Sequence, residues 1–297
     1  RKVFGRKVAV ADLTIEVQAG EIFGFLGPNG AGQTTSVKML LSLTRPTSGT
    51  ATLLGQPLGD RLVRARVGYL PEHFRFHEWL TAAEFLDLHG RLYGMSKSER
   101  AEAGPRLLAL VGLADRADTR LGAFSKGMLQ RIGLAQALLS DPDLVFLDEP
   151  TSGLDPLGRR LVRDIIKGLR EQGTAVFLNS HLLSEVEKTC DRVAFIREGT
   201  ILQTSTLEAF EEDSFQVIIR VGDPTPDLLN GLARFDPDVA MQRSNGRITL
   251  CLSDEAQLPQ LAGWIVDQGH TLYEMTPTRL SLEDRFLQIV GEDAGDG

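Results

Sequence analysis

Residues 21–35 read Glu21-Ile22-Phe23-Gly24-Phe25-Leu26-Gly27-Pro28-Asn29-Gly30-Ala31-Gly32-Gln33-Thr34-Thr35. The apolar run before Gly27 predicts a buried strand, and residues 34–43 carry apolar side chains at helical spacing. The turn between them fits the pattern of a phosphate-binding loop, Gly-x-x-x-x-Gly-Lys-Ser/Thr, at every position but one. A strand, a glycine-rich turn and a helix, in that order, form the setting that such a loop requires.

The residue types of this loop suit a phosphate. Its glycines let successive backbone N–H groups converge on an anion, and the positive end of the following helix adds to the attraction. Where the pattern has a lysine that reaches the β- and γ-phosphates, this chain has Gln33, which can donate a neutral hydrogen bond but carries no charge. We expect the whole loop to contact a nucleotide's phosphates, through Gly27, Pro28, Asn29, Gly30, Ala31, Gly32, Gln33, Thr34 and Thr35.

Two adjacent carboxylates, Asp148 and Glu149, end the apolar run 144–147. Neighbours on a strand point to opposite sides, and buried carboxylates need partners, so this pair is unusual. A magnesium-associated Asp148 followed by a general base at Glu149 accounts for both residues. The structural alternative is a polar end of a strand in an α/β fold.

The rest of the first two thirds of the chain alternates between strands and helices, which implies a mainly parallel sheet covered on both faces. Residues 7–26 are expected to form strands with a turn at Ala19-Gly20 between them, and a helical stretch covers about 80–140. We then expect helices at about 157–171 and 182–189, and strands at 175–178 and 192–196.

The pattern changes near residue 212. Strands and helices now follow in the order βαββαβ, which predicts a small ferredoxin-like α+β domain. Its second and third strands join through Asn245-Gly246, a strong hairpin signal. A last amphipathic helix is expected at about 281–290. The predicted segments are strands at 215–221, 239–243, 248–252 and 271–275, and helices at 227–234 and 257–267.

Six motifs, taken in order, resemble those of the ABC ATPase family over about residues 4–210. The first three are Phe4, where the family has an aromatic that stacks on adenine, the phosphate-binding loop, and Val67–Glu72, which resembles the Q-loop with Glu72 where most members have Gln. Phe124–Arg131 resembles the signature motif in the divergent form common in ABC-2 exporters. The last two are the carboxylate pair followed by Thr151–Asp155, which resembles the D-loop, and Asn179-Ser180-His181, which resembles the switch histidine.

The resemblance implies a P-loop ABC cassette over residues 1–211, with a parallel sheet core, an antiparallel N-terminal β subdomain and a helical subdomain at about 75–140. The remainder, 212–297, would be an accessory domain that strengthens or regulates dimerisation.

The resemblance also implies a sandwich of two cassettes, as in a homodimer. ATP bound by one loop would be covered by Ser125 and Gly127 of the opposite cassette. Catalysis would fall to Glu149, which activates water, to His181, which holds the γ-phosphate, to Asp155 in the D-loop and to the residue at position 33. The hydroxyl of Thr34, with Asp148 and Glu72, would organise Mg²⁺.

The implied partner is an ABC-2-type membrane permease, gripped near residues 72–80, at the cytoplasmic face of the membrane. No apolar run approaches the roughly 18 to 20 residues that cross a bilayer, so another chain would supply the membrane part. Nucleic acid is not expected as a partner, because the net charge is −8 and the pI about 5.3. Cys190 and Cys251 lie far apart and lack metal-ligand spacing.

Gln33 predicts weakened ATP binding and strongly reduced hydrolysis in this chain, because a charge-assisted contact is lost. The other motif residues are intact, which favours a single introduced substitution over a natural site that binds nucleotide and hydrolyses little. Two other functions stay open: a nucleotide-responsive module that does not hydrolyse, and a soluble ABC protein that acts on ribosomes or DNA.

Overall fold

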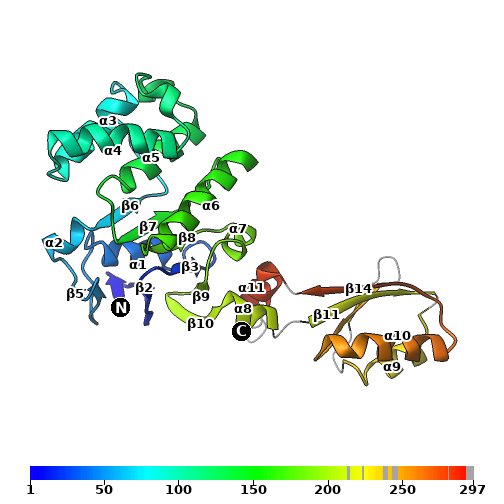
Figure 1. Cartoon of the computed structure of the whole chain (residues 1–297). Helices are drawn as coiled ribbons and strands as arrows, with labels where there is room; N and C mark the ends of the chain where they lie inside the picture. The colour runs from blue at the N-terminus through cyan, green and yellow to red at the C-terminus, as the bar shows by residue number, and fades with distance from the viewer. Residues whose placement is uncertain (213–214, 223, 237–239, 243–246, 280, 292–297) are drawn as a thin grey trace. The chain divides into compact units, whose positions relative to one another are not determined.

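The structure is a computed structural model that describes residues 1–212, 215–222, 224–236, 240–242, 247–279 and 281–291 (Figure 1). It divides into two compact units, Arg1–Ser205 and Thr206–Gly297. No helix in these described ranges is long and apolar enough to cross a bilayer.

A six-stranded sheet forms the centre of the first unit. Its inner strands consist almost wholly of apolar residues, are buried at every position and pair in parallel, as expected for a sheet covered on both faces. The carboxyl ends of these strands therefore meet at one edge of the sheet. The strands, in sheet order, are β10 (Thr200–Thr206), β9 (Arg192–Arg197), β3 (Ile22–Leu26), β8 (Ala175–Asn179), β7 (Leu144–Asp148) and β6 (Val67–Leu70).

Helices follow these strands and continue the alternation that the sequence predicted. In the helical part of the unit α3, α4 and α5 pack against one another (Figure 1). Both α3 and α4 begin with a capping box, formed by Thr81 with Glu84 and by Ser96 with Glu99. The helices are α1 (Gln33–Leu40), α2 (Arg61–Arg64), α3 (Ala82–Leu92), α4 (Lys97–Leu110), α5 (Lys126–Ala137), α6 (Pro156–Glu171) and α7 (Leu183–Glu187), with short 3-10 turns at Ala114–Arg116 and Leu121–Ala123.

The N-terminal segment departs from its prediction. Antiparallel pairs join β1 (Lys2–Phe4) to β2 (Lys7–Val10) and β4 (Thr52–Leu53) to β5 (Gln56–Pro57). The predicted turn at Ala19-Gly20 is present, whereas the strand predicted to continue from residue 11 to this turn is absent, apart from one isolated bridge. Its alternating apolar residues instead pack, partly buried, against the core of the first unit, and such burial gives a period-two pattern without a partner strand.

The second unit has the predicted order of elements. Its antiparallel sheet runs β12-β13-β11-β14, so that the first strand lies between the third and the fourth, as in a ferredoxin-like domain. Asn245-Gly246 lies outside the described residues. The elements are α8 (Leu207–Glu212), β11 (Phe215–Val221), α9 (Pro226–Leu232), β12 (Ala240–Gln242), β13 (Arg247–Cys251), a 3-10 turn at Glu255–Gln257, α10 (Leu258–Asp267), β14 (Leu272–Arg279) and α11 (Leu282–Gly291).

Candidate nucleotide-binding site

A cleft of about 240 Å³ opens where β3, β7 and β8 end. Residues far apart in the sequence line it because parallel strands deliver their carboxyl ends to the same edge. Most of the predicted loop and most of the predicted catalytic residues meet here. The lining residues are Lys7, Ala9, Gly27, Asn29, Gly30, Gly32, Gln33, Thr34, Thr35, Glu72, Asp148, Glu149, Asn179 and His181.

Direct contacts between main-chain atoms fix the base of the glycine-rich loop. Gly32 has a φ of +110°, and a Cβ there would lie 2.6 Å from the carbonyl oxygen of Ala9. Gly199 donates its N–H to the oxygen of Ala31 at 2.8 Å and accepts one from Ala11 at 2.8 Å. A Cβ on Gly199 would lie 2.7 Å from the backbone nitrogen of Ala11, so neither glycine has room for a side chain.

The loop leads into α1, whose first turn suits an anion. Gly32 caps the helix without a side-chain hydrogen bond, and no acidic residue lies in the first turn. The first N–H groups of a helix have no partner inside the helix. They therefore face the cleft with the positive end of the helix dipole, beside the exposed side chain of Thr34.

Gln33 connects the loop to the two neighbouring strands. Its Nε2 donates to Oδ1 of Asn179 at 3.1 Å, with a longer contact of 3.4 Å to the oxygen of Phe25. Asn179 in turn donates from Nδ2 to Oδ1 of Asp148 at 2.6 Å. The residue in the lysine position thus takes part in a chain of hydrogen bonds that ends on a carboxylate.

Asp148 is 3% exposed, and burial raises the pKa of its carboxyl group above the ordinary value. The hydrogen bond from Asn179 lowers this pKa, the negative charge of Glu72 raises it, and the positive charge of Lys38 lowers it. A buried carboxylate of this kind is chemically suited to a bound cation, which would supply a strong charge partner.

Glu149 follows with a φ of +53°, which is uncommon for a residue other than glycine. Its Oε2 lies 2.7 Å from Nδ1 of His181, and its Oε1 accepts from the backbone N–H of His181 at 2.9 Å. Burial raises the pKa of the Glu149 carboxyl group, and the contacts with His181 oppose the rise. The main chain of Glu149 is also held, by the oxygen of Asn179 at 2.8 Å and by Nε2 of Gln130 at 3.0 Å.

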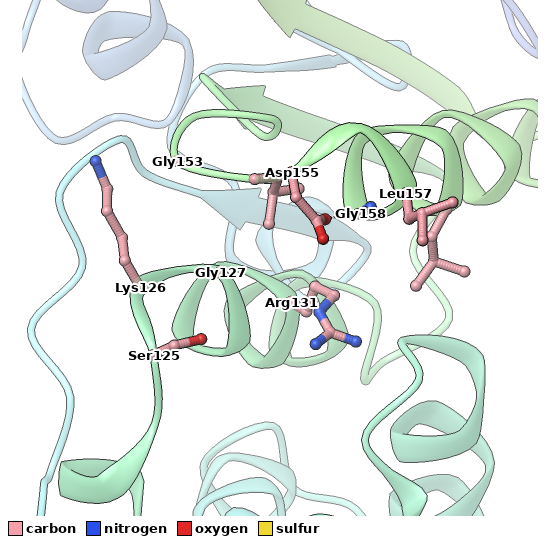
Figure 2. A pocket seen from close by; sticks show the side chains of 10 residues that line it. Ser125, Lys126, Gly127, Arg131, Gly153, Asp155, Leu157 and Gly158 are labelled. Atoms are coloured by element: carbon pink, nitrogen blue, oxygen red, sulfur yellow. Dashed lines mark hydrogen bonds between the residues drawn. The ribbon is translucent and has the colours of Figure 1, made fainter.

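Ser125, Gly127 and Asp155 lie elsewhere in the chain, in a separate hollow of about 540 Å³ (Figure 2). Ser125 caps α5 and accepts from the N–H of Met128, while Asp155 caps α6 and accepts from the N–H of Gly158 at 2.7 Å. Within one chain these residues do not line the cleft of the phosphate loop.

Two more predicted residues have different positions. Glu72 lines the cleft with a half-exposed side chain, and its Oε1 lies 3.9 Å from Nδ1 of His73. Phe4 lies on β1, half exposed, with the Lys2 ammonium 4.6 Å from the centre of its ring. It is not among the residues that line the cleft.

Asn179 and Gln130 received no role from the sequence, although both lie in quoted motifs. A signal for Asn179 was available: in parallel strands of equal length, the residue that ends β8 pairs with the one that ends β7, and Asp148 pairs with Asn179. Nothing in the sequence indicated that Gln130 reaches the carbonyl of Glu149, because that contact depends on where α5 packs.

Comparison with known proteins identifies the family. A family model described as ABC transporter matches residues 10–152. The chain is 50% identical over 286 residues to an uncharacterized ABC transporter ATP-binding protein of Synechocystis sp.. The match covers 94% of this chain and 78% of that protein. The chain belongs to the ABC transporter ATP-binding proteins.

Two further similarities agree with this. The whole chain is 37% identical over 298 aligned positions to the Nod factor export ATP-binding protein I of Rhizobium sp., and the match covers 99% of this chain and 95% of that protein. A solved structure of an ATP-binding subunit of an ABC transporter superposes with a TM-score of 0.66 at 31% identity, over 71% of this chain and 88% of that one.

The resemblance inferred from the motifs and the ABC cassette fold are therefore confirmed. The chain is an ATP-binding subunit of an ABC transporter, a family of ATPases whose cassettes dimerise and work with transmembrane permease subunits.

Proposed function

We propose that this cassette binds ATP with Mg²⁺ and drives export through a separate membrane subunit of the ABC-2 type, as a peripheral subunit at the cytoplasmic face. The observation that supports the nucleotide part is the single cleft into which Gly32, Thr34, Asp148, Glu149 and His181 all project. The similarity to Nod factor export ATP-binding proteins supports the direction of transport.

Thr34, Asp148 and Glu72 would hold the magnesium ion. They offer a hydroxyl and two carboxylates to the cleft, which are the hard oxygen ligands that Mg²⁺ prefers. Among the described residues there is no cluster of three His, Cys, Asp or Glu side chains that could hold a metal alone. That fits Mg²⁺, which uses one or two carboxylates together with substrate phosphates and, when bound, neutralises their charge.

Glu149 would act as the base for the attacking water. Burial makes its carboxylate a better proton acceptor, and the backbone N–H of His181 holds Oε1 in a fixed direction. His181 itself is well exposed toward the cleft, where it would hold the γ-phosphate. We assign Phe4 to the adenine ring in the same proposal.

A second copy of the chain would complete the site. Ser125, Gly127 and Asp155 line a hollow of their own at the starts of α5 and α6 (Figure 2). Both helix starts offer N–H groups to an anion, so this surface of one cassette is suited to cover a nucleotide bound by another. The second unit would strengthen that pairing. A chain truncated after residue 211 that still dimerised and hydrolysed ATP at the full rate would contradict this role.

Gln33 supports a further part of the proposal: hydrolysis by this chain is weak. A neutral side chain stands where the pattern has a charged donor, which removes about 1.5 to 3 kcal/mol of ground-state binding and more if the contact strengthens as charge develops. The second candidate function, a module that responds to nucleotide without hydrolysing it, is favoured by the same residue, since its amide is bonded inside the protein.

Purification with the adjacent membrane subunit tests the function. ATP turnover should depend on that subunit, rise in the Gln33→Lys version and disappear in Gln33→Lys with Glu149→Gln, which should still bind ATP. Loss of ATP binding together with turnover in the double variant would contradict the role of Glu149 as the base. Nucleotide binding without turnover, even with lysine at position 33, would favour the non-hydrolysing module. Purification as a particle with RNA would favour a soluble protein that acts on ribosomes.

A further inference from the structure

A chain of three side chains crosses the floor of the cleft. It runs from Gln33 Nε2 to Asn179 Oδ1 at 3.1 Å, and from Asn179 Nδ2 to Asp148 Oδ1 at 2.6 Å. Asn179 is 6% exposed and Asp148 3%. The bond between Asn179 and Asp148 is therefore shielded from water, where an unpaired amide would be costly, and the bond from Gln33 is partly buried.

The donors and acceptors along this chain can be assigned from its end. An ionised carboxylate only accepts, so the Asn179 atom that faces Asp148 must be the NH₂ group. The oxygen of Asn179 then faces Gln33 and needs a donor, which only the NH₂ group of Gln33 can supply. The second acceptor beside that group, the carbonyl oxygen of Phe25, requires the same orientation.

This orientation leaves Gln33 no donor for a phosphate. Its two amide hydrogens are directed at Asn179 and Phe25, and the remaining atom, Oε1, is an acceptor. A phosphate oxygen would be repelled by such an atom. Gln33 therefore does not take over the phosphate contact of the lysine that the loop pattern expects.

Asn179 also reaches the second carboxylate residue. The main-chain oxygen of Asn179 accepts a hydrogen bond from the main-chain N–H of Glu149 at 2.8 Å, beside the bond from its side chain to Asp148. It ends β8 opposite Asp148 in the register of β7, so the sheet itself brings its amide to this carboxylate. One residue thus holds the side chain of one carboxylate and the main chain of the next.

We propose that Gln33 and Asn179 are positioning residues for Asp148: hydrogen bonds from the phosphate loop through Asn179 hold the carboxylate in the orientation in which it meets the magnesium ion. The inference rests on the function proposed above. In this chain Gln33 orients Asp148, and the phosphates are bound by the main-chain N–H groups of the loop.

Nucleotide affinity measured with and without Mg²⁺ tests the proposal. Gln33→Met keeps the volume of the side chain and removes its hydrogen bonds, and Asn179→Ala removes the next link. Each should weaken binding of ATP in the presence of Mg²⁺ by roughly three- to tenfold. Each should leave binding of ATP in EDTA within about twofold, because neither amide donates to a phosphate in the parent chain with Gln33. The matched control is Gln136→Met, which removes an amide bonded to Tyr93 outside the cleft and should change neither affinity.

The double variant distinguishes a chain from two separate effects. With both links removed, the loss in Mg²⁺ should equal that of one variant, since either break frees Asp148; a loss equal to the product of the two would overturn the proposal. Equal losses with Mg²⁺ and with EDTA would also overturn it, because they would place the Gln33 amide on the phosphates.

A second measurement needs no nucleotide. In chemical denaturation the two substitutions should destabilise the protein non-additively, and additive losses would contradict the hydrogen-bonded chain. If the parent chain with Gln33 bound no ATP under either condition, the proposed function would be contradicted, while this denaturation experiment would still test the chain of hydrogen bonds. If Asn179→Ala does not fold, Gln33→Met decides alone through its two affinities.

Discussion

Nε2 of Gln130 donates a 3.0 Å hydrogen bond to the main-chain oxygen of Glu149, which has a φ of +53°. Gln130 lies in α5, the helix that begins at Ser125, and Glu149 follows the end of β7. One helix therefore begins at the surface proposed to meet the nucleotide of a second cassette and reaches, a turn later, the proposed base of its own site. A side chain of α5 therefore stabilises the uncommon backbone conformation at Glu149.

Removal of this hydrogen bond should lower turnover more than binding. In a Gln33→Lys background, Gln130→Met keeps the side-chain volume and should lower kcat by roughly tenfold, which corresponds to about 1.4 kcal/mol of lost positioning. Gln130→Glu should be worse, because a carboxylate oxygen would face the carbonyl. ATP binding should stay within about twofold of the parent in both variants. Equal kcat values for parent and Gln130→Met would show that the contact does not position Glu149.

Gln33→Lys should strengthen nucleotide binding. A charge-assisted contact worth about 1.5 to 3 kcal/mol corresponds to a gain in ATP affinity of roughly 10- to 100-fold, with a larger gain in turnover. Titration with ATP and a steady-state assay measure both. Gln33→Met, which adds no charge, should show neither gain. A lysine variant with the same ATP affinity and turnover as the parent chain with Gln33 would contradict the proposed defect.

Asp148→Asn should stabilise the free protein, and more so as the pH rises. Burial raises the folded-state pKa of Asp148 above its ordinary value of 3.8, so the folded state holds this proton more tightly than the unfolded chain. In the parent chain this proton stabilises the folded state below pH 3.8. That stability is lost as pH rises through the folded-state pKa, and it amounts to about 1.4 kcal/mol for each pKa unit between the two states.

The asparagine variant does not titrate, so its advantage in urea denaturation without Mg²⁺ should be larger at about pH 7 than at about pH 4. An advantage that shrank with rising pH would show that the carboxylate is stabilised in its charged form.

Gly32→Ala should destabilise the cassette and impair nucleotide binding. The new Cβ would lie 2.6 Å from the carbonyl oxygen of Ala9, at a φ of +110° that L side chains rarely adopt. We expect a cost of about 1 to 3 kcal/mol in urea denaturation. Gly168→Ala is the matched control, because it lies within α6 with nothing near its Cβ. The free energy of unfolding of the control variant should rise by about 0.5 to 1 kcal/mol. Similar changes in both variants would refute the contact at Gly32.

Much of the fold followed from the sequence because local signals and burial agreed. The apolar run before Asp148 forms a strand that is buried at every residue, and the βαββαβ order of the second unit gave its sheet order as well. The failure lay between residue 11 and the turn at Ala19-Gly20, where alternate burial against the core imitates a strand. Periodicity reports which side chains are buried and does not report whether a neighbouring strand is present.

The site was predictable as a set of residues, and its connections were not. The sequence identified Gln33 by what it lacks, a charge, but its partner Asn179 is 146 positions away and meets it only because β3 and β8 are neighbours in the sheet. Motifs name the residues that touch a ligand. The residues that hold them in place, such as Gln130, depend on packing between elements and leave no local pattern.

The contacts between Gly32, Ala9 and Gly199 involve only main-chain atoms. Every substitution at Gly32 or Gly199 adds a side chain where there is no space for one, so mutation cannot improve these contacts. A directed-evolution screen for tighter nucleotide binding should therefore recover few changes at the base of the loop. Its successful variants should instead gather at Gln33, where a side chain can be exchanged for a charged one of similar size.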